Sequence, residues 1–151
     1  LSSPTRGLWG GGNDSSVQKD TIDSVTIAST GNAIDFGTLA RKRTTMAGFS
    51  SPTRGIWSGG DPGVNIIDYI TIASGGNAQY FGDATIAASY RRGNGSNTRG
   101  VNNGGRTPTI TDTIEYVTIA TAGNALDFGD LSKPRVGMGV ASDSHGGLGG
   151  F

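Results

Sequence analysis

One seven-residue motif returns three times along the chain and divides it into units of nearly equal length. It reads TIASTGN at residues 26–32, TIASGGN at 71–77 and TIATAGN at 118–124, and each copy leads into an Ala-x-x-Phe-Gly tail. Successive copies lie 45 and 47 residues apart. A fixed period of about 20–50 residues is typical of proteins built from repeated structural units. The motif therefore limits the fold to a set of similar units placed side by side.

Each unit contains four segments with the composition of short β-strands. The third is the richest in β-branched residues, lacks a helical apolar stripe and ends near a Gly-Asn pair that favours a hairpin turn. We therefore expect an all-β protein with four-stranded units of about 46 residues. The first strand of a unit is expected at 44–50, 89–95 and 136–142, and the second at 6–9 and 54–57. The third is expected at 22–29, 67–74 and 114–121, and the fourth at 34–36, 79–81 and 126–128.

These units make up one repeat domain over residues 1–151. The repeats run at about 1–40, 41–87 and 88–132, with a partial fourth copy at 133–151. A glycine pair closes the second strand of every unit, where it permits positive φ or close backbone approach. A polar loop of variable length follows, at 13–20, 61–65 and 106–109. Because insertions in repeat proteins often lie on the binding face, these loops are candidates for recognition.

Charge and composition argue against several classes of function. The chain has 12 Lys plus Arg and 12 Asp plus Glu, so its formal net charge is zero, and a nucleic-acid partner is not expected. The short basic run at 41–43 is expected to lie on a solvated loop. No apolar run reaches the ~20 residues of a membrane helix, so membrane insertion is not expected either. Without cysteine, disulfide and thiolate chemistry are absent.

The four-strand unit with a Gly-Gly pair after its second strand resembles the kelch repeat. The sequence pattern TIASTGNAxDFG, together with Ser-Ser-x-Thr-Arg-Gly, is also similar to kelch-like arrays in structural and fibre proteins of marine and cyanobacterial bacteriophages. This resemblance covers nearly the whole chain. It implies a β-propeller that serves as a rigid structural or adhesion platform on a virion or tail fibre, outside the cell.

Two departures from the kelch pattern leave alternatives open. The third copy differs at several positions, and the chain holds three third-strand units where propellers typically have four to eight blades. Self-association or further repeats of a longer chain would complete such a ring. A β-trefoil, which has three repeats and a similar length, is the alternative fold.

Residues that recur in every unit are interpreted as structural. We expect the repeated carboxylates to form ion pairs with the repeated arginines, the tryptophans to pack between units, and the phenylalanines to anchor the fourth strands. These residues are Asp23, Asp68 and Glu115; Arg6, Arg54 and Arg99; Trp9 and Trp57; and Phe36, Phe81 and Phe128.

Residues confined to one repeat are the better candidates for a ligand site. The third repeat contributes one such set: Tyr90, Arg91, Arg92, Asn102 and Asn103. No catalytic residue, cofactor or metal site is expected, since the single histidine, His145, lies in a Ser/Gly-rich turn and the loops lack a dense Asp/Asn ladder. The sequence favours a non-enzymatic module that recognises a host surface, with a cell-surface glycan as a candidate partner. A lectin or carbohydrate-active enzyme on the same scaffold is the alternative.

Overall fold

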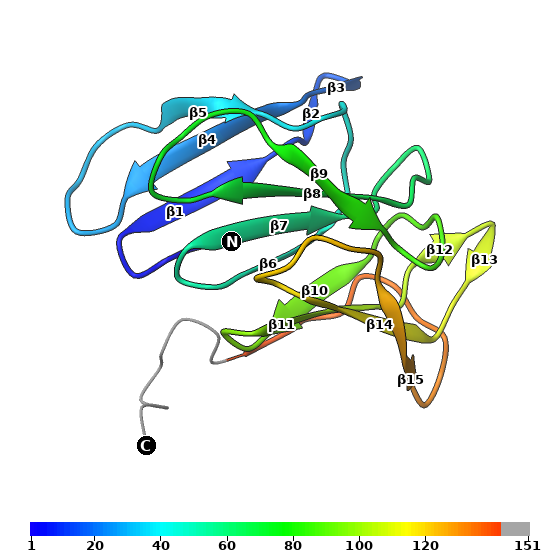
Figure 1. The fold of residues 1–151 in the computed structure, drawn as a ribbon. Coiled ribbons are helices and arrows are strands. Elements are labelled where there is room, and N and C mark those ends of the chain that lie inside the picture. Colours follow the sequence, from blue (N-terminus) through cyan, green and yellow to red (C-terminus); the bar gives the residue numbers. More distant parts are fainter. Residues whose placement is uncertain (143–151) are drawn as a thin grey trace.

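The computed structural model describes residues 1–142, and this part of the chain contains strands and turns without a helix. Its three main sheets are antiparallel and follow one another along the sequence (Figure 1). The first comprises β1 (Arg6–Gly10), β4 (Thr21–Thr26) and β5 (Ile34–Thr38); the second β6 (Ala47–Ser50), β7 (Arg54–Ser58), β8 (Ile66–Thr71) and β9 (Gln79–Asp83); and the third β10 (Arg92–Gly95), β11 (Arg99–Asn103), β14 (Thr113–Thr118) and β15 (Leu126–Asp130).

Two small hairpins complete the strand inventory of the described chain. They are β2 (Asn13–Asp14) with β3 (Val17–Gln18), and β12 (Arg106–Thr107) with β13 (Thr109–Ile110). Both occupy variable loops that follow the glycine pairs. The all-β prediction is confirmed, and each main sheet forms from consecutive strands of one expected repeat. Since every ladder between named strands of the main sheets stays within its repeat, the arrangement does not favour the β-trefoil alternative.

The same β-bulge interrupts all three sheets where the third strand meets the fourth. The register shifts after Ile22, Ile67 and Ile114, each of which lies opposite the glycine of the Phe-Gly tail. These three glycines have φ values of 147°, 159° and 135° in Gly37, Gly82 and Gly129. Side chains rarely tolerate such backbone geometry, which accounts for the invariant glycine of the tail.

Each pair of neighbouring sheets encloses one hydrophobic core. We call the face of a sheet that points toward the following sheet its forward face, and the opposite face its rear face. The forward face of the first sheet packs against the rear face of the second through Leu8, Ile22, Phe36, Leu39, Trp57, Ile70 and Ile72. The second and third sheets pack in the same way through Phe49, Ile56, Ile67, Phe81, Ala84, Val117, Ile119 and Ala125.

The recurrent motif forms a turn that binds the outer strand of the preceding sheet. Gly76 N donates to Phe36 O at 2.8 Å, and Thr38 N donates to Asn77 Oδ1 at 3.1 Å. The next interface repeats this pattern, because Asp83 N donates to Asn124 Oδ1 at 3.0 Å. A Cβ at Gly37 would lie 2.4 Å from Gly76 O, so the glycine is also needed for this close approach.

The recurrent arginines join each sheet to the next, but not through carboxylates. Arg6 Nη1 donates to Ile72 O at 2.6 Å, and Arg54 Nη1 donates to Ile119 O at 2.9 Å. The Arg54 guanidinium also lies over the Tyr69 ring, 4.4 Å from its centroid. The expected pairing of repeated acids with repeated arginines is therefore wrong. The two groups lie on opposite faces of a sheet, with arginine on the forward face and the acid on the rear face.

Burial of the predicted anchors depends on whether a neighbouring sheet covers them. Phe36, Phe81 and Trp57 are buried, as predicted. The prediction is wrong for Phe128, which is 53% exposed, and for Trp9, which is 59% exposed. Phe128 lies on the forward face of the third sheet and Trp9 belongs to the first sheet. Within the described residues, no sheet follows the third or precedes the first.

The segment after the third sheet packs on it without forming a strand. The predicted strand at 136–142 is absent, and the last nine residues of the expected fourth copy, 143–151 with His145, lie outside the described residues. Nevertheless Arg92 Nε donates to Met138 O at 3.1 Å, and Asn94 Nδ2 donates to Ala141 O at 3.3 Å. The segment thus lies beside β10, as β10 lies beside β6.

A matched pair of substitutions measures how much the inter-sheet cores stabilise the fold. We expect Phe81→Ala to lower the free energy of unfolding by about 3–5 kcal/mol, because it removes a buried ring from the second core. The equivalent Phe128→Ala should cost less than about 1 kcal/mol, since that ring is mostly solvated in the single chain. Urea denaturation at high dilution measures both, and equal losses would contradict this account.

Candidate functional site

Two residues of the set predicted to bind a ligand, Arg91 and Asn102, are fully buried between the second and third sheets. Arg91 Nη1 lies 2.5 Å from Glu115 Oε1 in an ion pair whose two side chains are completely inaccessible. Asn102 Nδ2 donates to Ser58 Oγ at 2.8 Å and to the same Glu115 oxygen at 3.2 Å. The carboxylate also accepts from Thr85 N at 2.7 Å and from the Thr85 hydroxyl. This network joins the two sheets.

An equivalent buried ion pair joins the first and second sheets. Arg43 Nη2 lies 2.8 Å from Asp68 Oδ2, which also accepts from Ala40 N at 3.1 Å. Arg43 Nη1 donates in addition to Ile66 O. Burial lowers the pKa of Arg43 and raises the pKa of Asp68, while the attraction between the two charges opposes both shifts. Arg43 was expected on a solvated loop, so the sequence did not reveal this role.

The departures of the third repeat form a coordinated exchange of side chains. In the first interface the Trp57 ring lies against Gly10, where a Cβ would be only 2.9 Å away. In the second interface Asn102 replaces the tryptophan and bonds Ser58, which stands where the first sheet has Gly10. Arg91 takes the position of Met46 and extends into the same interface. The third copy therefore packs against the second sheet through a different set of side chains.

The other three members of the predicted set lie apart from the buried Arg91 and Asn102 and do not form a surface cluster. Tyr90 is partly exposed and has a φ of 57°. Arg92 Nη1 donates to Arg91 O at 3.0 Å, and its Nε is held by Met138 O. Asn103 is nearly buried at the end of β11. The structure thus separates the five residues into a buried inter-sheet network and individual peripheral positions.

Removing one partner of a buried ion pair tests its contribution to stability. Asp68→Ala leaves Arg43 charged and unpaired in the interface, which should cost about 3–5 kcal/mol of folding free energy. The equivalent Asp23→Ala alters an exposed carboxylate on the first sheet and should change stability by less than about 0.5 kcal/mol in dilute solution. Chemical denaturation of both variants provides the measurement. A loss below about 1 kcal/mol for Asp68→Ala would contradict the proposed contribution.

The variable loops gather on the side of the molecule opposite the turns of the recurrent motif. Figure 1 shows the β2–β3 and β12–β13 hairpins on the right and the β4–β5 and β8–β9 turns on the left. Gln18 Nε2 donates to Asp61 Oδ2 at 2.7 Å, so the loops of the first two repeats touch. We call residues 13–18, 61–64 and 106–110 the loop surface. It exposes apolar Val17 and Ile110 among polar and small residues.

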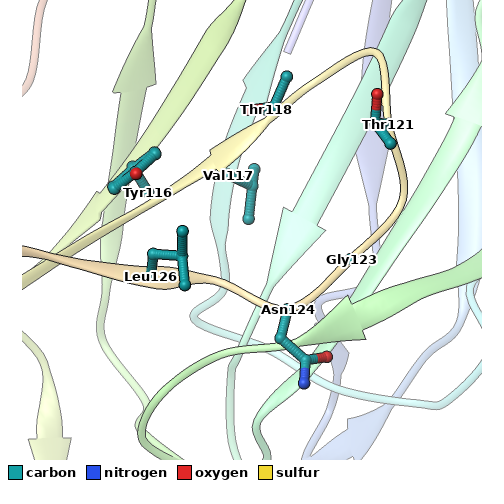
Figure 2. Close-up of a pocket in the computed structure, with 7 residues that line it drawn as sticks. All are labelled: Tyr116, Val117, Thr118, Thr121, Gly123, Asn124 and Leu126. Atoms are coloured by element: carbon teal, nitrogen blue, oxygen red, sulfur yellow. The ribbon is translucent and has the colours of Figure 1, made fainter.

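A pocket of about 370 Å³ lies inside the β14–β15 hairpin (Figure 2). Tyr116 and Leu126 line it from the two strands, and Asn124 lies in the turn. Corresponding pockets of about 80 and 130 Å³ occur in the second and first sheets. The Asn124 side-chain oxygen already accepts a hydrogen bond from Asp83 N. The pocket is therefore a recurrent feature of the hairpin, and its copy in the third sheet, which no other sheet follows in the described chain, has a greater volume than the other two.

The described residues contain neither a cluster of possible metal ligands nor a membrane-spanning helix. In residues 1–142 no three His, Cys, Asp or Glu side chains are grouped so that they could hold a metal ion. The same part of the chain has no helix long and apolar enough to cross a membrane.

Comparison with known proteins gives no assignment: no protein-family model matches the chain, and no curated protein matches it either.

Proposed function

We propose that the chain is a non-enzymatic structural and adhesion module with a kelch-like propeller architecture, which recognises a cell-surface glycan through its loop surface. The resemblance of its repeats to structural and fibre proteins of bacteriophages supports a location on the outside of a virion or tail fibre. The observation that carries the proposal is the separation of roles in the structure. Recurrent residues join the sheets, whereas the variable segments lie together on one side.

Contacts along the inner edges of the sheets support the propeller architecture. β6 and β10 are the first strands of their sheets and lie beside each other. Ser50 at the end of β6 donates through its hydroxyl to Ser2 O at 2.6 Å, and the segment at 138–141 lies beside β10. First strands that meet along one line, with the later strands extending outward, are the arrangement of propeller blades around an axis.

The composition of the loop surface supports recognition of a polar partner such as a glycan. It combines turns and polar side chains, among them the charged Asp14, Asp61 and Arg106, with two exposed apolar residues, Val17 and Ile110. Protein sites for polar ligands commonly combine apolar contact with a few placed hydrogen-bonding groups. No residue of the loop surface belongs to either inter-sheet core, so apart from the buried Val64 its side chains can vary with little effect on packing.

A loop exchange tests the recognition role. The full chain is labelled and assayed on a glycan array and on candidate bacterial cells, beside a variant whose residues 13–18 are replaced by the short loop 61–64. We expect the parent to bind and the variant to lose most of that binding, with circular dichroism showing an unchanged fold. Pro52→Ala, in the exposed β6–β7 turn outside the loop surface and outside both exposed sheet faces, is the control and should bind as the parent does.

Two outcomes would overturn the proposed function. Binding that is unaffected by the loop exchange would place recognition elsewhere on the molecule, and an absence of binding to any glycan or cell would remove the adhesion role. A third measurement addresses the alternative of a carbohydrate-active enzyme. Glycans recovered after prolonged incubation should be intact, and their cleavage would show that the module is catalytic.

A further inference from the structure

The forward face of the third sheet retains the groups that bind a following sheet elsewhere in the chain. Arg99 lies over the Tyr116 ring at 4.4 Å, in the same way as Arg54 lies over Tyr69. Arg54 also donates to two carbonyls of the third sheet, whereas Arg99 is exposed. Phe128 stands where Phe36 and Phe81 are buried. These groups are arranged for a docked sheet that the described residues do not provide.

The glycine of the third Phe-Gly tail gives a second, independent indication. A Cβ at Gly82 would lie 2.2 Å from Gly123 O in the turn of the next sheet, whereas a Cβ at Gly129 would meet nothing within 4 Å. Gly129 nevertheless keeps the bulged conformation, with φ at 135°. The outer strand of the third sheet therefore has the backbone shape that receives a turn of the recurrent motif.

The rear face of the first sheet carries the complementary half of such an interface. Ile27 is 55% exposed, although its equivalents Ile72 and Ile119 are each 1% exposed between sheets. Within the described residues Asn32 makes no hydrogen bond to a preceding sheet, whereas its equivalents Asn77 and Asn124 each accept one. The first sheet thus presents an unused copy of the turn that binds a preceding sheet.

Charge is complementary between the two exposed faces. Arg43 N donates to Lys19 O, and Gly12 N donates to Arg43 O, which holds Arg43 where it reaches Asp68. The backbone of Arg135 is held equivalently, by Thr111 O and Gly105 N. Arg135 is exposed, and Asp23, the equivalent of Asp68, is exposed on the first sheet. Arg135 on the third sheet's side and Asp23 on the first sheet therefore occupy the positions that form an ion pair in the internal interface.

From these matches we infer that the forward face of the third sheet binds the rear face of the first sheet of a second copy of this chain, head to tail. The interface repeats the contacts of the two internal ones: Arg99 to the carbonyls of Ile27 and Ala28, Asn32 to the outer strand beside Gly129, and Arg135 to Asp23. Trp9 does not contribute to the inference, because Asn103 stands where Gly10 receives the Trp57 ring. Two copies supply six main sheets, within the usual four to eight blades of a propeller.

A second copy fits these faces better than an unrelated protein, because both halves of a repeating interface lie on the same chain. A contact of this kind is heterologous, since different patches of the two copies meet. It closes into a ring when the rotation between copies permits. The association is independent of glycan recognition by the loop surface, so either proposal can fail without the other.

Complementary blocking variants test the head-to-tail contact. Ile27→Asp blocks the rear face of the first sheet, and Phe128→Asp blocks the forward face of the third sheet. Light scattering coupled to size-exclusion chromatography should give a mass of at least two chains for the parent. Each variant alone should associate at least about thirtyfold more weakly, the effect of losing a central contact residue. Val17→Asp, on the loop surface, is the control and should associate as the parent does.

Mixing the two blocked variants gives the decisive result. Each retains one intact face, so an equimolar mixture should form a one-to-one dimer that neither variant forms alone. A parent that stays monomeric at every attainable concentration would overturn the inference, as would self-association of either blocked variant at parental strength. Circular dichroism and thermal unfolding of the separate variants establish that both are folded. If they are folded and the mixture remains monomeric, the inference is also overturned.

Charge reversal tests the proposed pair between copies. Arg135→Asp and Asp23→Arg should each weaken association by about tenfold or more, whereas the chain carrying both changes should recover most of the lost affinity. Equal weakening in the double variant would exclude this ion pair from the interface.

Discussion

Backbone pairing between the turn of one sheet and the outer strand of the preceding sheet is the constraint on which the structure depends. The turn donates from Gly76 N to Phe36 O and from Ala78 N to Thr38 O, and the Asn77 side chain accepts in addition from Thr38 N. This pairing fixes the separation and direction of neighbouring sheets before side chains are considered. It requires a bulge with a glycine in the receiving strand, and a hairpin ending in Gly-Asn in the strand pair that docks. The most regular sequence motif is therefore an interface motif.

Strand positions could be predicted because they depend on local patterns that recur. β-branched runs, Gly-Asn turns and glycine pairs place most of the strands within a few residues of their observed bounds. The interactions between sheets could be predicted only in part. Recurrence indicated that Arg54 and Asp68 were structural, but not what each contacts. Strand alternation held the missing information, since Arg54 shares a face with Ile56 while Asp68 lies opposite Trp57.

The residues that sequence reasoning assigned to a ligand show the limit of reading one repeat by itself. Asn102 and Arg91 differ from their equivalents in other repeats, and such differences are often functional. Here they replace a tryptophan and a methionine in an interface whose facing residue also changes, from Gly10 to Ser58. Because the compensating residue belongs to a different repeat, the exchange becomes visible only when the sheets are placed face to face. Packing at close to crystalline density makes such linked changes necessary.

The loop surface contributes no residue to either inter-sheet core, and this has a consequence for how such a chain can evolve. Most random substitutions in a small domain erode stability, and that erosion usually limits how quickly a binding surface can change. In this chain the free energy that holds the fold together is stored in contacts between sheets, at a distance from the residues that vary. Apart from the buried Val64 and the backbone bridges at Asp61 and Arg106, the loops can therefore accept new side chains while the stability margin changes little.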